Sequence, residues 1–332
     1  MQHTNEIEDV STALHGIVYK KTQGHYTVED QGRPVVCSIS NKLRKQLVYP
    51  TAAPWSLRPH VVRVDDIRTV DPVAIGDRVC YVNSGDGTGM IVEVLQRTNH
   101  LNRRAAGDKP LEQVIVANVD QIVVVFAAAN PAPKWWLLDR YLAAAESADL
   151  PALICITKLD LADRASIEGE VRAYERIGYS VVVTSAVTGE GTECLREELR
   201  GRVSVLAGSS GVGKTTLLNT LQPGLGLRVG EVNRATGKGK HTTSSLEMFS
   251  LAFGGSIVDT PGMREFALWG DADLDVAELF REMRPLLGRC RFGAGCAHVH
   301  EPGCAIKEAV ASGGISTRRY ESYLRMKGQG ER

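Results

Sequence analysis

The sequence lacks long hydrophobic runs and a leader-like beginning. Its longest unbroken apolar stretch, residues 122–129, is far shorter than the ~20 residues that a membrane-spanning helix needs. The first ten residues are acidic and contain no basic segment followed by an apolar one. We therefore expect no secretory signal, no membrane partner and a cytoplasmic protein.

An excess of charge of one sign is also absent, because 39 Lys and Arg balance 39 Asp and Glu. Apolar residues make up 43% of the chain and charged residues 23%, which excludes a disordered or collagen-like protein. A length of 332 residues predicts about two domains with room for a third small one. From residue 281 onward, ten basic residues face five acidic ones. This excess allows contact with nucleic acid, although ordinary surface scatter explains it equally well.

The seven cysteines do not form an obvious disulfide framework, because their number is odd and four are scattered. The other three crowd together with one histidine in the pattern C-x5-C-x-H-x5-C. Three thiolates and one imidazole can close a tetrahedral structural zinc site with no open position for a substrate. His300 is a competing imidazole, and free thiols are the alternative. The expected zinc ligands are Cys290, Cys296, His298 and Cys304.

Short β-rich runs separated by turn residues fill the first hundred residues and predict a small barrel. Residues 41–60, with three prolines, interrupt them as an insertion. Buried strands then alternate with helices expected at 135–147, 164–177 and 191–200, which predicts an α/β layer. Further helices are expected at 274–287 and 317–327. The predicted domains are 1–108, 109–272 and 273–332; the expected barrel strands are 16–19, 26–29, 34–38, 61–64, 78–82 and 90–95.

A phosphate-binding loop follows the expected strand at residues 203–207. The pattern is GxxxxGK[ST] between a strand and a helix, which is the context that the mechanism requires. Backbone N–H groups of such a loop face the phosphates, its Lys neutralises the β and γ oxygens, and its Thr hydroxyl ligates Mg²⁺. Thr215 is the expected magnesium ligand. The expected nucleotide-binding residues are Gly208, Ser209, Ser210, Gly211, Val212, Gly213, Lys214, Thr215 and Thr216.

Guanine selection is predicted by the tetrapeptide Thr157, Lys158, Leu159, Asp160 at the end of a buried strand. A carboxylate at this place can accept hydrogen bonds from N1–H and the exocyclic amine of guanine, whereas adenine has no N1–H. Ser185 and Ala186 end the next strand, where a backbone N–H can meet the guanine oxygen.

The remaining elements of the site lie after the P-loop. Asp259 and Gly262, in the sequence DTPG, are expected to hold Mg²⁺ through water and to sense the γ-phosphate. The basic stretch 237–244 is expected to act as a switch, with Thr242 or Thr243 as a second magnesium hydroxyl, although a solvated linker explains any single residue of it equally well. Met263 follows DTPG, so no amide side chain orients the attacking water there. His241 is the candidate for that task, although a loop histidine is more often merely exposed.

The order of these elements indicates a circular permutation, because the base-reading residues precede the P-loop. In this order the DTPG switch leads directly into the Cys/His segment. The nucleotide state is therefore expected to influence that segment.

Taken together, the motifs TKLD, TSA, GSSGVGKTT, GKGKHTTS and DTPGMREF, with the Cys/His cluster, resemble the RsgA family of small-subunit-dependent GTPases over nearly the whole chain. The resemblance implies an N-terminal OB-type β-barrel, a circularly permuted α/β P-loop GTPase and a C-terminal helical zinc-binding module. It implies GTP or GDP with Mg²⁺ and one structural Zn²⁺ as cofactors. It also implies that the chain binds the small ribosomal subunit and its rRNA and hydrolyses GTP there late in maturation of the subunit. Thr157 departs from the family, where Asn is commoner, and five residues instead of four separate the first two cysteines.

Two other functions remain open at this point. One is a nucleotide-gated RNA-binding module whose turnover is incidental. The other is a GTPase metallochaperone that passes metal through the Cys/His cluster. We expect a monomer in each case.

Overall fold

The computed structural model describes residues 13–22, 24–44, 71–104, 112–225, 246–259 and 275–328. The chain divides into two compact units: Met1–Asn118 with Ser245–Met248, and Val119–Ser244 with Phe249–Arg332. Within the described residues, no helix is both long and apolar enough to cross a membrane.

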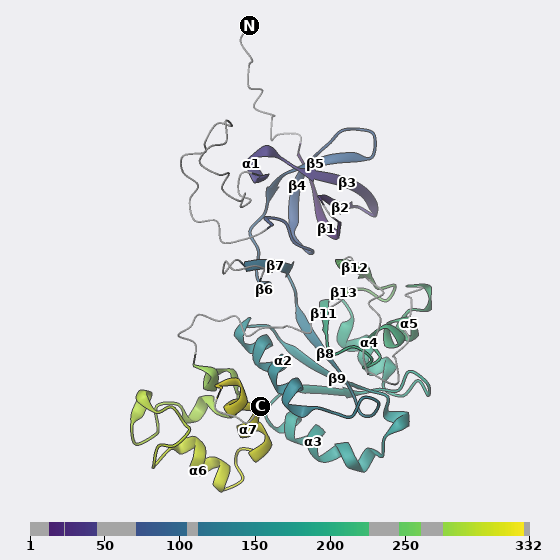
Figure 1. Ribbon diagram of the computed structural model, residues 1–332. Helices are drawn as coiled ribbons and strands as arrows, with labels where there is room; N and C mark the ends of the chain where they lie inside the picture. The colour runs from purple at the N-terminus through teal and green to yellow at the C-terminus, as the bar shows by residue number, and fades with distance from the viewer. Residues whose placement is uncertain are drawn as a thin grey trace, which may run out of the picture. The chain divides into compact units, whose positions relative to one another are not determined.

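The first unit contains a closed five-stranded barrel (Figure 1). The strands are hydrogen-bonded in the order β1-β2-β3-β5-β4, and β4 pairs back to β1. Only the β3–β5 pair is parallel among these five. The barrel prediction is thereby confirmed, while the expected strand at 61–64 lies outside the described residues. The strands are β1 (Leu14–Thr22), β2 (His25–Asp30), β3 (Arg33–Ile39), β4 (Arg78–Asn83) and β5 (Thr88–Val94).

Buried and more exposed residues alternate along the barrel strands, and the buried ones mark the face that points into the barrel. In β2, Tyr26 and Val28 are buried, whereas the intervening residues are more exposed. This period of two is the pattern of a strand with one face on a core. After β3, the short helix α1 (Asn41–Arg44) begins the segment that was expected to be an insertion, and residues 45–70 lie outside the described part.

A two-stranded hairpin that the sequence did not suggest follows the barrel. Strands β6 (His100–Arg104) and β7 (Glu112–Ala117) pair antiparallel. Gly76 makes a close approach possible here, since a Cβ on it would lie 2.2 Å from the carbonyl oxygen of Ala117, and its φ is +83°. Strand β12 (Leu246–Ser250) pairs with β1 through Lys20 and Glu247.

The second unit is built on a parallel sheet in the order β10-β9-β8-β11-β13. All seven residues of β8 are buried, as expected for a Val- and Ile-rich central strand covered on both faces. The sheet confirms the predicted α/β layer. Its strands are β8 (Gln121–Ala127), β9 (Ala152–Thr157), β10 (Ser180–Val183), β11 (Val203–Ala207) and β13 (Ser256–Asp259).

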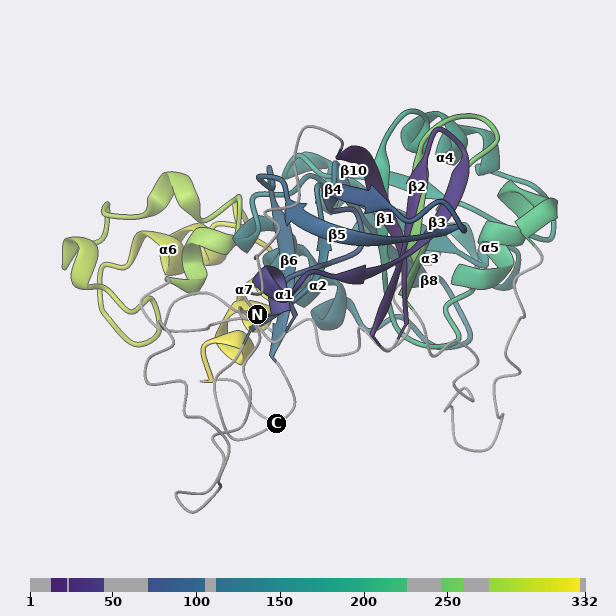
Figure 2. The same ribbon diagram turned by 90° about the horizontal axis from the view of Figure 1, so that it is seen from above.

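Helices cover both faces of this sheet (Figures 1 and 2). On one face, Val123 and Val125 of β8 share a core with leucines of α4 and α5. On the other, Phe126 contacts Trp135 of α2, and Trp135 contacts Tyr174 of α3. The helices expected at 135–147, 164–177 and 191–200 are confirmed within one residue as α2 (Trp135–Ser147), α3 (Arg164–Arg176) and α4 (Thr192–Leu199). The helix expected after the P-loop is α5 (Lys214–Leu221).

The last described segment, 275–328, lies beside α2 in both ribbon views. The helix expected at 274–287 is wrong: the described part, 275–287, holds two 3₁₀ turns, η5 (Val276–Leu279) and η6 (Arg284–Leu286). The chain is extended at Phe280, and Pro285 has no N–H to donate to the carbonyl oxygen four residues earlier, as a continuous helix would require. The turn η7 (Gly293–Gly295) and helices α6 (Ala305–Ala311) and α7 (Thr317–Met326) follow.

Candidate nucleotide site and metal centre

The predicted nucleotide residues gather at the carboxyl ends of the parallel strands. The strand register places Thr157, at the end of β9, beside Ala127 at the end of β8, and Asp259 beside Leu206 of β11. In open parallel sheets, this edge is where ligands bind. The topology therefore brings together segments that are far apart in the sequence.

The P-loop runs from β11 into α5. Gly208 has a φ of +146°, and a Cβ on it would lie 2.3 Å from the carbonyl oxygen of Val125, so only glycine fits there. Gly213, with a φ of +98°, precedes the first turn of α5. The Nζ atom of Lys214 donates to the carbonyl oxygens of Gly208 (2.8 Å) and Ser209 (2.9 Å). This ammonium therefore lies on the loop that is expected to hold the phosphates.

Two side chains tie the base-reading segment to the P-loop. The buried hydroxyl of Thr157 lies 2.5 Å from the carbonyl oxygen of Val212. The Nζ atom of Lys158 donates to the carbonyl oxygen of Gly211 (2.7 Å) and also contacts that of Asn130. Partial burial lowers the pKa of Lys158, and the charge of Asp160 opposes this shift. Although it departs from the family, Thr157 thus makes a direct contact with the loop.

The carboxylate of Asp160, which is predicted to bind guanine, is held in place by hydrogen bonds. It follows Lys158, whose φ is +59°, in the turn η2 (Leu159–Leu161). One of its oxygens accepts a hydrogen bond from the buried Ser185 hydroxyl at 2.6 Å. That hydroxyl in turn accepts from the backbone N–H groups of Val187 and Thr188. The bond from Ser185 therefore orients the carboxylate. Because Asp160 is also exposed, the carboxylate is accessible to a base.

Several expected residues are only partly covered by the described structure. His241, Thr243 and Gly262 lie outside it, and of Asp259 only the backbone, at the end of β13, is described. Thr215 and Thr216 lie in the first turn of α5. Ala186 follows the buried Ser185. Their roles in binding Mg²⁺ or nucleotide stay predictions.

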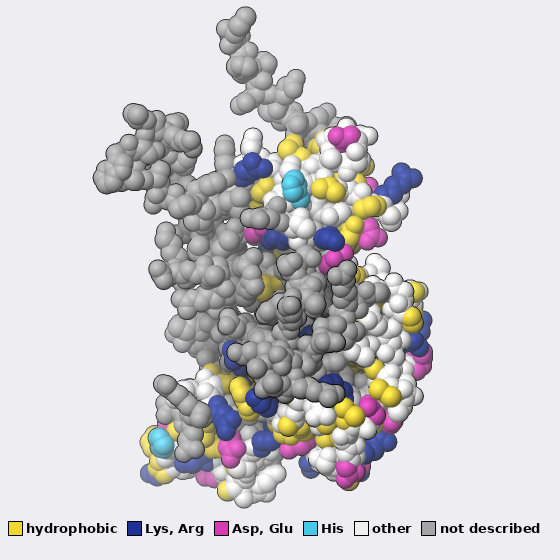
Figure 3. Space-filling model, turned by 45° about the vertical axis from the view of Figure 1, so that its right-hand side comes forward, with side chains coloured by type: hydrophobic (Ala, Val, Ile, Leu, Met, Phe, Trp, Pro, Cys, Tyr) yellow, Lys and Arg dark blue, Asp and Glu magenta, His cyan; other side chains and the backbone are white. Residues whose placement is uncertain are grey.

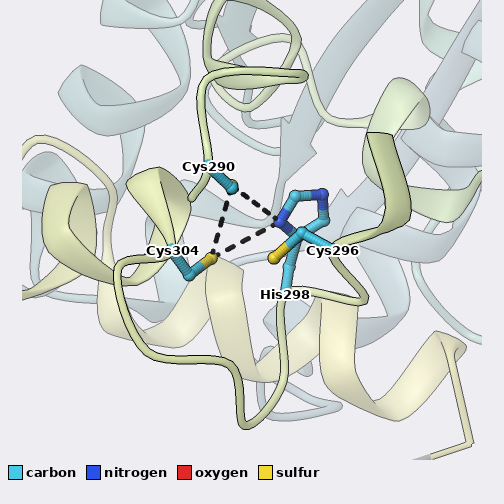
Figure 4. Close-up of side chains that lie close together, drawn as sticks. All are labelled: Cys290, Cys296, His298 and Cys304. Atoms are coloured by element: carbon cyan, nitrogen blue, oxygen red, sulfur yellow. Dashed lines mark hydrogen bonds between the residues drawn. The ribbon is translucent and has the colours of Figure 1, made fainter. Parts of the chain in front are cut away.

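The four predicted zinc ligands converge in the structure, as Figure 4 shows. Their ligand atoms all lie within 4.8 Å of one another, and all four residues are buried. The Sγ atoms of Cys290 and Cys304 are 3.8 Å apart, and each lies 3.4 Å from Nδ1 of His298. A tetrahedral Zn²⁺ with bonds of about 2.3 Å to sulfur and 2.0–2.1 Å to nitrogen requires S···S edges of roughly 3.8 Å and S···N edges of roughly 3.6 Å. The cluster therefore has the donor set for zinc, and the edges between Cys290, His298 and Cys304 have the spacing for it.

The surrounding residues hold the backbone of this metal centre. The carboxylate of Glu301 accepts from the backbone N–H groups of Ala297 (2.9 Å), Val299 (2.9 Å) and His300 (3.0 Å). Backbone N–H donors, its own included, lower the pKa of Glu301 to about 2. His298 is buried in the cluster, whereas His300 is exposed. The geometry thus favours His298 over the competing imidazole.

A buried ionic network that was not predicted joins α7 to α2 and α3. Asp139 of α2 is fully buried and accepts from Arg319 (2.7 Å), Arg318 (2.9 Å) and the hydroxyl of Tyr174 (2.6 Å). Arg319 also pairs with Glu282 at 2.7 Å. One signal was present in the sequence: Asp139 is the only acidic residue among the apolar side chains at the start of α2.

The profile of the family described as RsgA GTPase matches residues 94–269. A protein of Gemmatimonas aurantiaca named "Small ribosomal subunit biogenesis GTPase RsgA" is 46% identical over 321 residues, which cover 96% of this chain and 98% of that protein. A protein of Moorella thermoacetica with the same name is 39% identical over 311 residues, covering 94% and 95%.

Two solved structures have a similar fold. The crystal structure of YjeQ from Thermotoga maritima is 33% identical, with a TM-score of 0.71 over 96% of this chain and 100% of that chain. The structure titled "YloQ, a circularly permuted GTPase" is 26% identical, with a TM-score of 0.64 over 99% and 98%. Both the order of the motifs and the three-dimensional fold are therefore those of a circularly permuted GTPase.

Proposed function

This chain belongs to the RsgA GTPase family and is a GTPase, and we propose that the GTP-bound chain binds the small ribosomal subunit. There it hydrolyses GTP during late maturation of the subunit. The names of the relatives support the subunit as partner, and one observation best supports GTP as the ligand: Lys158 and Thr157 of the base-reading segment contact the P-loop directly. A single ligand that spans both segments must carry both guanine and phosphates. The cofactors of the proposed reaction are GTP or GDP with Mg²⁺.

Different residues of the described structure bind the base and the phosphates. Asp160 accepts from the guanine edge, in the orientation that Ser185 gives it. The Lys214 ammonium exchanges its contacts with loop carbonyls for the β- and γ-phosphate oxygens, and the Thr215 hydroxyl ligates Mg²⁺, which neutralises phosphate charge. Asp259 holds the same ion through water.

Hydrolysis adds water to the γ-phosphorus and breaks its bond to the β–γ bridging oxygen. We assign the orientation of that water to His241, and Thr243 would supply a hydroxyl to Mg²⁺, on the basis of their place in the switch stretch. Without an amide side chain after Gly262, unaided turnover is slow, and the subunit orders the switch.

The Cys/His cluster is proposed to hold one structural Zn²⁺. All four candidate ligands are buried, and four ligands would fill the tetrahedral coordination of Zn²⁺ and leave no open position for exchange. This closed set favours a structural role over that of a metallochaperone.

Contact with ribosomal RNA is proposed for the barrel and for the basic C-terminal segment. Figure 3 shows dark blue and magenta side chains interspersed over the described part of one face, so no single sign of charge covers it. Local basic groups and shape are therefore the expected determinants of RNA contact. A monomer that acts in the cytoplasm fits this proposal.

Co-sedimentation with purified small subunits tests the proposed cycle. The chain is expected to pellet with the subunits in the presence of a non-hydrolysable GTP analogue and to remain in the supernatant with GDP. Lys214→Ala removes the phosphate contact and is expected to abolish the difference. Equal pelleting of the wild-type chain with both nucleotides would contradict a GTP-gated encounter.

Turnover separates the proposed enzyme from a nucleotide-gated binding module. With GTP itself, the wild-type chain is expected to pellet at first and then leave the subunits as phosphate appears. Release from the subunits before phosphate appears would favour the binding module with incidental turnover.

A further inference from the structure

Helix α7 contacts both the metal centre and the GTPase helices. Toward the metal centre, the Tyr320 hydroxyl donates to the carbonyl oxygen of His298 at 2.7 Å. The Tyr323 hydroxyl and Lys327 Nζ both donate to the carbonyl oxygen of Ala297, at 2.9 and 2.8 Å. The backbone that presents His298 is therefore bonded to α7.

Toward the GTPase helices, α7 presents Arg318. Its guanidinium pairs with Asp139 of α2 at 2.9 Å and with Glu170 of α3 at 2.8 Å. It also donates to the Tyr174 hydroxyl at 3.1 Å. The several N–H donors of the planar guanidinium reach these three partners at once, in a fixed geometry that the ammonium of a lysine does not provide.

Arg318 also reaches the first residue of α2. Its guanidinium carbon lies 5.7 Å from the centre of the Trp135 ring, within the range of a cation–π contact. The ring of Trp135 also contacts the ring of Phe126, with 5.2 Å between the ring centres. The carbonyl oxygen of Phe126 in turn lies 3.3 Å from the Thr157 hydroxyl. The start of α2 is thus packed between α7 and the nucleotide edge of the sheet.

The loop that leads into α2 contacts the nucleotide site directly. Asn130 lies in this loop, and its carbonyl oxygen contacts the same Lys158 ammonium that donates to Gly211 of the P-loop. The position of the start of α2 therefore affects one of the two ties between the base-reading segment and the P-loop.

We propose that Arg318 is a positioning residue for the nucleotide site and that, through it, occupation of the Cys/His cluster by Zn²⁺ and binding of GTP favour each other. The metal orders the loop that carries His298, this loop fixes α7, and Arg318 fixes the start of α2 against Lys158. The inference rests on the proposed function, because it takes GTP as the ligand of the described site. Coupling between two sites is reciprocal in free energy, so each ligand must raise the affinity for the other by the same factor.

The test measures the equilibrium affinity for a fluorescent GTP analogue in the full-length chain. Four states are compared: zinc-loaded and chelator-treated, each for the wild type and for Arg318→Ala. Chelation of the wild type is expected to weaken binding about five-fold or more, the usual lower range of such coupling. Arg318→Ala is expected to weaken binding to a similar extent while zinc is bound, and chelation is then expected to add little.

Arg325→Ala is the matched control, because Arg325 lies on the same helix and is exposed. It should behave as the wild type does in all states. Zinc content is measured for every variant, and Arg318→Lys, which keeps the charge but not the fork, replaces Arg318→Ala if the latter does not retain its metal. The lysine variant is expected to reproduce the loss of coupling.

A reciprocal measurement provides the readout that a merely structural role of Arg318 would not change. The zinc affinity of the wild type, obtained by competition with a chromogenic chelator, is expected to rise with GTP by the factor found above, and not to rise in the Arg318 variant. An unchanged GTP affinity after chelation of the wild type would overturn the inference, as would the same chelation effect in the Arg318 variant. Failure of the zinc-loaded wild type to bind GTP at all would instead contradict the proposed function.

Discussion

The metal centre and the nucleotide site are assembled in different ways. All four residues of the metal centre come from positions 290–304, and their side chains are buried. The described residues of the nucleotide site come from loops after β9, β10 and β11, and Asp160 among them is exposed. In the first site a short segment brings four candidate ligands of one ion together, whereas the second site lies on a sheet that has its own buried core.

This difference predicts different responses to damage. A segment whose buried core includes the ligands of the ion is expected to lose its structure when the ion is removed. A site at the edge of a parallel sheet loses affinity while the sheet remains folded. The predictions below test this contrast, from the largest expected effect to the smallest.

Removal of the metal is expected to have the largest effect. Structural zinc sites contribute apparent binding free energies of about 10–16 kcal/mol at neutral pH. Treatment with a strong chelator, or Cys304→Ser, should therefore unfold the segment that contains the cluster, seen as lost helical circular dichroism and increased proteolysis after residue 275. Cys194→Ser changes an exposed cysteine and serves as the control. An unchanged spectrum with zinc fully removed would contradict a structural metal.

Loss of Arg319 is expected to destabilise the contact between the two sites. Its guanidinium is buried and pairs with Asp139 and Glu282, so Arg319→Met leaves the Glu282 carboxylate without this partner and Asp139 with only Arg318 and Tyr174. Breaking a buried ion pair in this way costs about 3–5 kcal/mol. Chemical denaturation measures the loss, and Arg325→Met on the exposed side of α7 should change stability little. Equal midpoints for the two variants would argue against the network.

A change of base specificity is expected from Asp160→Asn. The amide places a donor where guanine also donates, which removes hydrogen bonds to a charged group worth about 1.5–3 kcal/mol each. The affinity for GTP should fall about 100-fold, while that for xanthosine triphosphate, which has a carbonyl in place of the exocyclic amine, should rise. Isothermal titration with both nucleotides checks this, with unchanged thermal unfolding of the empty protein as the control. Retention of GTP affinity would remove Asp160 from the site.

The smallest effect is expected from Thr157→Val, which deletes the hydroxyl bonded to the Val212 carbonyl but keeps the volume. A lost hydrogen bond of this kind costs about 1 kcal/mol, or roughly five-fold in affinity for GTP. Thr157→Ser retains the hydroxyl and should bind GTP as the wild type does. If both variants bind alike, the hydroxyl does not position the P-loop.

The parts that sequence predicted well are those that local patterns specify. The structure places the P-loop between β11 and α5 and the TKLD segment at the end of β9, and it brings the four candidate metal ligands together, while their binding roles stay predictions. Helix α2 was predicted over 135–147 because its apolar residues follow a helical period, and the structure gives Trp135–Ser147. The strand pattern in the first hundred residues likewise predicted a barrel.

The parts that sequence missed depend on contacts between distant segments. The hairpin of β6 and β7 is polar at its first strand, so its pairing shows no alternating pattern. The segment 274–287 has a helical apolar spacing, but the chain is extended at Phe280 and Pro285 lacks the N–H that a continuous helix would require. Arg318 and Arg319 look like surface residues in sequence, and only the fold places Asp139 opposite them.

Phosphate release tests the central claim most directly. GTP and ATP are supplied to the purified chain with and without small ribosomal subunits, at fixed salt concentration because contacts with RNA phosphates depend on it. The account predicts slow release from GTP alone, strong stimulation by the subunits and no release from ATP. Release from GTP that the subunits do not stimulate, or equal release from ATP, would contradict it.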